Sequence, residues 1–181
     1  KNSLEKLPMP MLLCIGAVNT HLIKLGLRGY VSINVQTGDA LDTHSFATLI
    51  GVGATTVNPY LAFDSLYERY TKKLFGNLNF DECVSRFIKS VNLGLLKIMS
   101  KMGISVLSSY RGGCNFETVG LSRTIVKDFF PGVLSKISGI GLTGIEKKIR
   151  DIHKEAFENG ANILPIGGIY RYRKNGETHQ Y

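Results

Sequence analysis

GLLKIMSKMGISVLSSYRGG, residues 94–113, is the stretch that decides the fold. Its apolar positions follow a helical period up to Met102 and a strand period from Ile104, and the change falls on Gly103, a residue suited to the left-handed turn that ends helices. We therefore predict a unit of helix, turn, strand and open loop. In parallel α/β folds, the loops after the carboxyl ends of strands hold ligands and partners. The loop residues expected to make such contacts are Ser108, Ser109, Tyr110, Arg111, Gly112 and Gly113.

The helix that leads into this unit is predicted to span residues 81–102, because its apolar residues keep one helical stripe over the whole length. Lys97 and Lys101 are one turn apart on it and share a face. Such a pair favours a solvated helix face, and contact with an anion or a carboxylate is the alternative.

The rest of the chain continues the same alternation. Short strands are expected at residues 11–15, 30–35 and 54–57, and helices at residues 18–25, 42–50, 63–74 and 125–130. Asp42 is predicted to accept amide hydrogens at the start of its helix. The fold class that follows is α/β, with mostly parallel strands in an open sheet or a partial barrel. The strand-end loops at residues 16–19, 36–39, 58–60 and 108–113 are then expected to gather at one edge of the sheet.

Length and composition indicate one domain with short extensions. The 181 residues are 44% hydrophobic and 20% charged, and no apolar run approaches the roughly 20 residues that cross a bilayer. We expect a linker at residues 1–10, an α/β segment at 11–160 and an extended connector at 161–181, with Asn175-Gly176 as a turn. A cytoplasmic protein without a membrane partner is predicted.

The net charge of +8 raises the possibility of a nucleic-acid partner. Only residues 170–174, YRYRK, interleave aromatic and basic side chains, and no RNA-binding motif accompanies them. A solvated strand face is favoured there over an RNA contact. An acidic surface on a partner domain accounts for the excess positive charge equally well.

Residues for metal binding or covalent catalysis are not found in any recognised spacing. Cys14, Cys83 and Cys114 form no CxxC pair, and the four histidines form no HExxH motif. Cys114 follows Arg111 closely, but a catalytic thiol would also need a base such as His21 or His44 brought near by folding. An incidental cysteine is the favoured interpretation, and no catalytic residue, metal ligand or cofactor ligand is predicted.

Two glycine-rich segments invite comparison with phosphate-binding loops. Gly51 and Gly53 follow a helix and precede a strand, the reverse of the order that a phosphate loop needs, so helix termination is favoured. Residues 138–144, SGIGLTG, are expected to connect to a last helix, with Thr143 and Glu146 in capping-box spacing. Anion binding by this segment, or by the loop from Arg111 to Gly113, stays open as an alternative.

Three stretches, residues 16–62, 94–123 and 135–148, closely resemble the large subunit of glutamate synthase, and KIMSKMGIS at residues 97–105 is highly specific to that family. One departure is Asn19, at a position where histidine is expected in many members. The resemblance maps the chain to the later part of the central domain, before the FMN-binding domain.

This resemblance implies a function for the chain. The family makes glutamate from glutamine, 2-oxoglutarate and a reductant, with FMN and an iron-sulfur cluster in the complete enzyme. The segment is then expected to serve as a scaffold and ammonia-tunnel region, inactive alone, between glutaminase and FMN-binding domains, and the resemblance also allows a reductase (beta) subunit as partner. Lys97, Lys101, Ser108, Tyr110, Arg111, Gly112 and Gly113 are the expected interdomain contacts. The alternative is a free-standing anion- or phosphate-binding module.

Overall fold

A computed structural model describes residues 5–158 of the chain. The chain divides into two compact units, Met9–Ile145 and a second formed by Lys1–Pro8 with Glu146–Tyr181. The linker predicted at residues 1–10 is described only from residue 5. The connector predicted at 161–181, with its Asn175-Gly176 turn and the YRYRK segment, lies outside the described residues.

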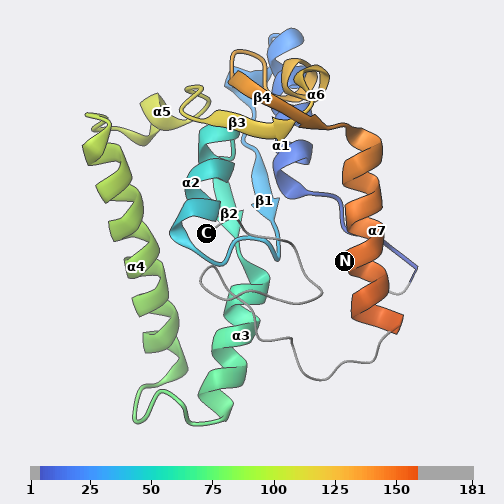
Figure 1. The fold of residues 1–181 in the computed structure, drawn as a ribbon. Coiled ribbons are helices and arrows are strands. Elements are labelled where there is room, and N and C mark those ends of the chain that lie inside the picture. The colour runs from blue at the N-terminus through green and yellow to red at the C-terminus, as the bar shows by residue number, and fades with distance from the viewer. Residues whose placement is uncertain (1–4, 159–181) are drawn as a thin grey trace. The chain divides into compact units, whose positions relative to one another are not determined.

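Helices and short parallel strands alternate along the chain (Figure 1), in the order α1 (Met11–Lys24), the 3-10 helix η1 (Arg28–Tyr30), β1 (Asn34–Gln36), α2 (Thr43–Val52), β2 (Thr56–Asn58), α3 (Tyr60–Thr71), α4 (Phe80–Lys101), α5 (Leu107–Tyr110), β3 (Glu117–Leu121), α6 (Arg123–Phe129), β4 (Leu134–Ile140) and α7 (Leu142–Glu158). The α/β class and the parallel pairing are confirmed. The described strands form two separate pairs, β1 with β2 and β3 with β4, so the sheet is open and no barrel closes within residues 5–158.

The first strand pair and α2 form the centre of the Met9–Ile145 unit. Asp42 caps α2 as predicted, because its carboxylate accepts the Ser45 amide hydrogen at 2.8 Å. Gly53 ends the helix with φ of 140°, also as predicted. The strand expected at residues 30–35 begins late, since η1 occupies Arg28–Tyr30. The buried residues of this core cluster are Ile15, Val35, Ala40, Phe46, Leu49, Ala54 and Val91.

The strand predicted at residues 11–15 is wrong, because α1 is one continuous helix from Met11 to Lys24. Pro10 precedes its first turn, a position that costs the helix no hydrogen bond. Gly16 is buried inside the helix, and a Cβ added there would lie 2.6 Å from the Phe129 carbonyl oxygen. Close packing against α6 therefore explains a glycine that resembles a strand end in the sequence.

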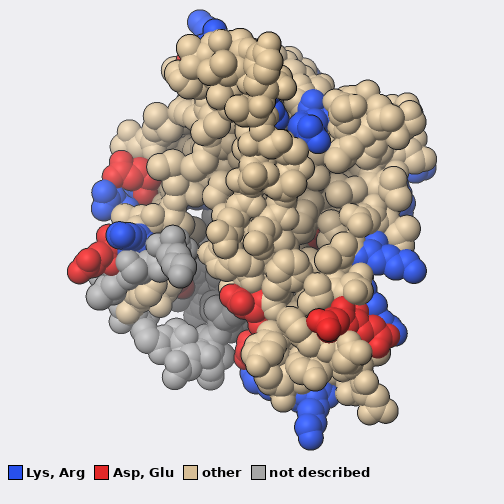
Figure 2. All heavy atoms as spheres, turned by 180° about the vertical axis from the view of Figure 1, so that it is seen from behind, with Lys and Arg blue, Asp and Glu red and all other residues tan. Residues whose placement is uncertain are grey.

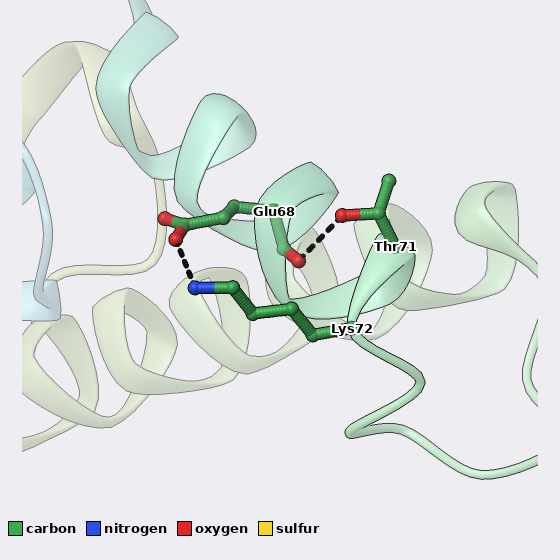
Figure 3. Close-up of polar contacts among 3 residues, drawn as sticks. All are labelled: Glu68, Thr71 and Lys72. Carbon is green, nitrogen blue, oxygen red and sulfur yellow. Dashed lines mark hydrogen bonds and ion pairs between the residues drawn. The ribbon is translucent and has the colours of Figure 1, made fainter.

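The helices α3 and α4 form a hairpin. At the end of α3, the Lys72 ammonium contacts the Glu68 carboxylate at 2.5 Å, and the Thr71 hydroxyl donates to the Glu68 carbonyl at 2.8 Å (Figure 3). Asn79 caps α4, the longest helix among the described residues, which matches the predicted helix within one residue at each end. Gly94 lets α4 approach α2, since a Cβ there would lie 2.5 Å from Thr43 Cγ2.

After α4 the fold departs from the prediction. Gly103 has φ of 70° and ends the helical region as expected, but the strand predicted from Ile104 does not form, and the short helix α5 at residues 107–110 takes up the start of the predicted loop. Tyr110 explains the difference, because its side chain is only 1% exposed and its hydroxyl donates to the Ala47 carbonyl of α2 at 3.1 Å. A tertiary anchor therefore overrides the local alternation of apolar residues.

The second strand pair was not predicted. Parallel strands β3 and β4 are joined by α6. Its N-cap is Ser122, whose hydroxyl oxygen accepts the Ile125 amide hydrogen at 3.3 Å. The loop expected at residues 138–144 is wrong in its first half, since Ser138–Ile140 complete β4. Thr143 lies inside α7 instead of capping it. Gly139 packs on the Gly120 backbone and leaves no room for a Cβ.

Candidate functional site

Two of the four predicted strand-end loops lie together. Because β1 and β2 are parallel, with Gln36 opposite Asn58, residues 36–39 and 58–60 leave the same edge, and the Thr37 amide donates to the Asn58 carbonyl at 3.1 Å. The other two loops contradict the prediction, since residues 16–19 lie within α1 and residues 108–113 follow no strand. Only two of the four loops therefore lie at the predicted edge of the sheet.

The predicted contact residues fall into two groups. Lys97, Lys101 and Ser108 are exposed, on α4 and α5. Tyr110 belongs to the core, where its ring meets Phe116 edge-on at 6.5 Å between centroids. Burial raises the pKa of the Tyr110 hydroxyl above its usual value.

The backbone amides of the loop at residues 111–113 are engaged within the unit. Each of the three amides donates to a backbone carbonyl: Arg111 to that of Leu107 at 3.0 Å, Gly112 to that of Gly51 at 2.8 Å, and Gly113 to that of Tyr110 at 3.3 Å. Arg111 is half-buried, and its Nε atom is buried with no hydrogen-bond partner among the described residues. The loop thus offers an anion none of these three amides, whereas Arg111 keeps donor capacity.

A partly open cavity of about 370 Å³ lies inside the Met9–Ile145 unit, between α1, α2, β3 and the end of α6. Its walls come from α1, α2, the segment 112–116, β3, α6 and the turn after α6. Most of the lining is apolar, including Val52, Phe116 and Phe130. The opening stretch of the sequence therefore ends at this cavity, to which Gly112 contributes.

Few titratable groups line the cavity. Among the described lining residues these are His44, Cys114 and Glu117, and none is Lys or Arg. Glu117 pairs with Lys136 at 3.3 Å, and the His44 ring lies edge-on to Phe116 at 6.4 Å between centroids. Folding thus brings Cys114 and His44 to the same cavity, but no described contact joins them, and the Cys114 thiol faces the Pro131 carbonyl at 3.8 Å.

Arg28 organises one wall of the cavity and was missed at the sequence level. Its guanidinium donates to Asn19 Oδ1, to the Val31 carbonyl and to the Gly53 carbonyl, each at 2.7 Å. Asn19 itself lines the cavity. The departure from the expected histidine therefore falls on a residue that holds Arg28. A lone arginine after a helix carries no sequence signal for this role.

Metal and cofactor sites were sought among the same residues. Within residues 5–158, no group of three or more His, Cys, Asp or Glu side chains could hold a metal ion. Cys14, Cys83 and Cys114 come from α1, from α4 and from the loop before β3, which does not fit an iron-sulfur cluster. The backbone amides of residues 111–113 already donate to carbonyl groups of the chain, and the described cavity lining contains no Lys or Arg. Neither place therefore fits the phosphate of FMN.

Two other surface properties bear on partners. No helix in the described part of the chain combines the length and apolarity that crossing a membrane requires. Figure 2 shows the Lys and Arg side chains of one face of the molecule scattered among other residues instead of gathered in a single patch.

Comparison with known proteins gives the family. The family model described as Glutamate synthase central domain matches residues 1–122. The large chain of NADPH glutamate synthase from Azospirillum brasilense is 54% identical over 171 residues, which cover 94% of this chain and 11% of that protein. The corresponding large chain of Bacillus subtilis is 41% identical, covering 96% of this chain and 11% of the relative. The ferredoxin-dependent glutamate synthase of Pyropia yezoensis is 43% identical over a stretch that covers 97% of this chain and 12% of that protein. This chain spans about a tenth of the length of these relatives, and it belongs to the glutamate synthase central-domain family.

Proposed function

We propose that this chain is a central segment of a glutamate synthase, an oxidoreductase that converts glutamine, 2-oxoglutarate and a reductant into two glutamates. The observation that carries the proposal is the match of 94% of this chain to 11% of a glutamate synthase large chain. The segment serves as a scaffold between a glutaminase domain and an FMN-binding domain of the same polypeptide, and the iron-sulfur cluster is held elsewhere.

The cavity is the proposed part of the ammonia path. Its apolar lining disfavours ammonium, since a buried charge without a partner is costly, so ammonia stays neutral and nucleophilic there. The described lining also contains no Lys or Arg, so no cationic donor there would retain ammonia. Thr48 and Asn115 are among the polar side chains of this mostly apolar lining.

Filling the cavity tests this path. Thr48 lines it from α2, so Thr48→Phe in the complete large chain should uncouple the two half-reactions, with more glutamine hydrolysed than 2-oxoglutarate aminated. Added ammonium salt should restore glutamate formation. Thr48→Ser adds no volume and serves as the matched control. A folded Thr48→Phe enzyme with unchanged coupling would remove the cavity from the path.

The isolated chain is proposed to be inactive. Glutamine, 2-oxoglutarate and reductant should yield no glutamate with the 181-residue chain alone. Turnover by the purified chain would contradict this.

Lys97, Lys101, Ser108 and Arg111 stay proposed as interdomain contacts because none of these side chains is fully buried. Tyr110 acts instead from inside the core, where it positions the loop that contains Gly112 and Gly113. The alternative, a free-standing anion-binding module, predicts micromolar binding of inorganic phosphate or FMN to the chain. The amides at residues 111–113 already donate within the chain, which argues against such binding. Titrating the chain with phosphate and with FMN distinguishes the binding module from the enzyme segment.

A further inference from the structure

The solvent-facing side of α4 combines lysines with exposed leucines. Arg86, Lys89, Leu93, Leu96 and Lys97 are all exposed and recur at helical spacing, and we call them the α4 outer face. Leu93 is 57% exposed and Leu96 is 60% exposed. The opposite side of α4 is buried through Cys83, Val91 and Met99. Among the described elements of its unit, α4 packs mainly against α2 and α3 (Figure 1), so the outer face has no described neighbour of comparable extent.

Charge on this helix is segregated. Its only acidic residues, Asp81 and Glu82, lie in the first turn, where they complement the helix dipole. Arg86 is paired with Glu82 at 2.7 Å, and no described ion pair involves Lys89 or Lys97. From Arg86 onward the outer face is thus positively charged around an apolar centre, in a chain whose net charge is +8.

We propose that the α4 outer face docks an acidic amphipathic helix from another domain of the same large chain, of which this segment covers about a tenth. Eight residues separate Lys89 from Lys97, which places them about 12 Å apart along the axis at 1.5 Å per residue. A partner helix with carboxylates eight residues apart and apolar side chains between them would pair both lysines and cover both leucines. Nucleic acid would satisfy the lysines but leave Leu93 and Leu96 against its charged backbone.

This inference rests on the proposed function only in requiring that the chain works inside a larger glutamate synthase, and it does not depend on the ammonia path. It adds the chemistry of the partner to one of the proposed contacts, Lys97. Its readout can therefore be separated from catalysis.

The test uses the complete large chain carrying this segment, purified after nuclease treatment. Zero-length coupling with a carbodiimide should join Lys89 or Lys97 to Asp or Glu residues outside residues 1–181, located by mass spectrometry. Acetylation of Lys89 and Lys97 should be several-fold slower than acetylation of Lys73, an exposed lysine that follows α3. In Leu93→Ser/Leu96→Ser, acetylation of Lys89 and Lys97 should rise while that of Lys73 stays unchanged.

Other outcomes overturn the proposal. Acetylation of Lys89 and Lys97 at the rate of Lys73, with no cross-link from either, would show a bare face. Protection seen only before nuclease treatment would make the occupant a nucleic acid. Coupling of glutamine hydrolysis to glutamate formation is measured on the same samples. Normal coupling with unprotected lysines would reject the docking surface alone, whereas protected lysines in an enzyme without glutamate synthase activity would reject the proposed function alone.

Discussion

Two substitutions of Tyr110 separate the stability that comes from filling a core position from the stability that comes from its hydrogen bond. The side chain is the largest among those less than 2% exposed, and its hydroxyl donates to the Ala47 carbonyl of α2 at 3.1 Å. Tyr110→Phe keeps the ring and removes the donor, which should cost about 0.5–1.5 kcal/mol. Tyr110→Ala also leaves a cavity and removes the edge contact with Phe116, which should cost about 3–5 kcal/mol.

These values are measurable against a total stability of about 5–15 kcal/mol. Urea titration of the chain, followed by far-ultraviolet circular dichroism, should show a fall of about 2 M in the midpoint for Tyr110→Ala at a typical slope of about 2 kcal/mol per molar urea. Tyr110→Phe should lower the midpoint much less. If Tyr110→Ala costs no more than Tyr110→Phe, the side chain is not the anchor that holds α5 on α2.

Alkaline pH gives an independent check on the same residue. Burial raises the pKa of Tyr110 in the folded chain, so this group stabilises the fold fully below the unfolded value of about 10 and loses that contribution as pH rises through the higher folded value. The difference in stability between the wild-type chain and Tyr110→Phe should therefore shrink as pH rises past that range. A difference that stays constant would show that the hydroxyl is not desolvated.

Three further substitutions test local contacts. Gly94→Ala should destabilise by about 1–3 kcal/mol despite the better helix propensity of alanine, because the new Cβ meets Thr43 of α2, and Thr43→Ala should recover most of the loss in a double-mutant cycle of urea midpoints. Arg28→Lys should cost about 1–3 kcal/mol in the same assay, since an ammonium cannot reproduce three guanidinium contacts, and a neutral result would show that they are dispensable. Asp42→Ala should cost about 1 kcal/mol near neutral pH. Hydrogen bonds from Ser45 lower the pKa of Asp42, so this contribution is present above the unfolded pKa and disappears as pH falls through the folded one, and a cost that persists at low pH would contradict the capping role.

The sequence predicted correctly those helices whose ends are determined by residues at the ends themselves. Asp42 accepts a first-turn amide, Gly53 and Gly103 adopt positive φ, and the apolar stripe of α4 extends from one predicted end to the other. Each of these depends on atoms within one or two helical turns. Sequence pattern therefore sufficed for α2 and α4.

Tertiary contacts decided the elements that were predicted wrongly. The run at residues 11–15 has the composition of a buried strand, yet Gly16 packs against α6, more than a hundred positions later. The run after Gly103 alternates like a strand, but Tyr110 reaches α2 and stabilises a helical turn. Short apolar runs suit either structure, and only a distant partner selects one.

The candidate site was less predictable than the fold. The cavity draws its lining from segments between Leu12 and Val133, and no motif links them. The opening stretch did lead to it, because Tyr110 is a core anchor and Gly112 lies at the wall. The predicted loop therefore lies beside the cavity, although the strand that was expected to precede it does not form.

The contact between α1 and α6 has a consequence for dividing the protein experimentally. The family model ends at residue 122, whereas Gly16 and Thr20 of α1 are covered by Phe129 and Phe130, and the Thr20 hydroxyl donates to the Phe129 carbonyl at 3.3 Å. A polypeptide cut at the family boundary would uncover this patch of α1 and strip β3 of its only described strand partner. The end of the family model and the end of the compact unit therefore differ in this protein, and expression trials should extend at least through residue 145, where the Met9–Ile145 unit ends.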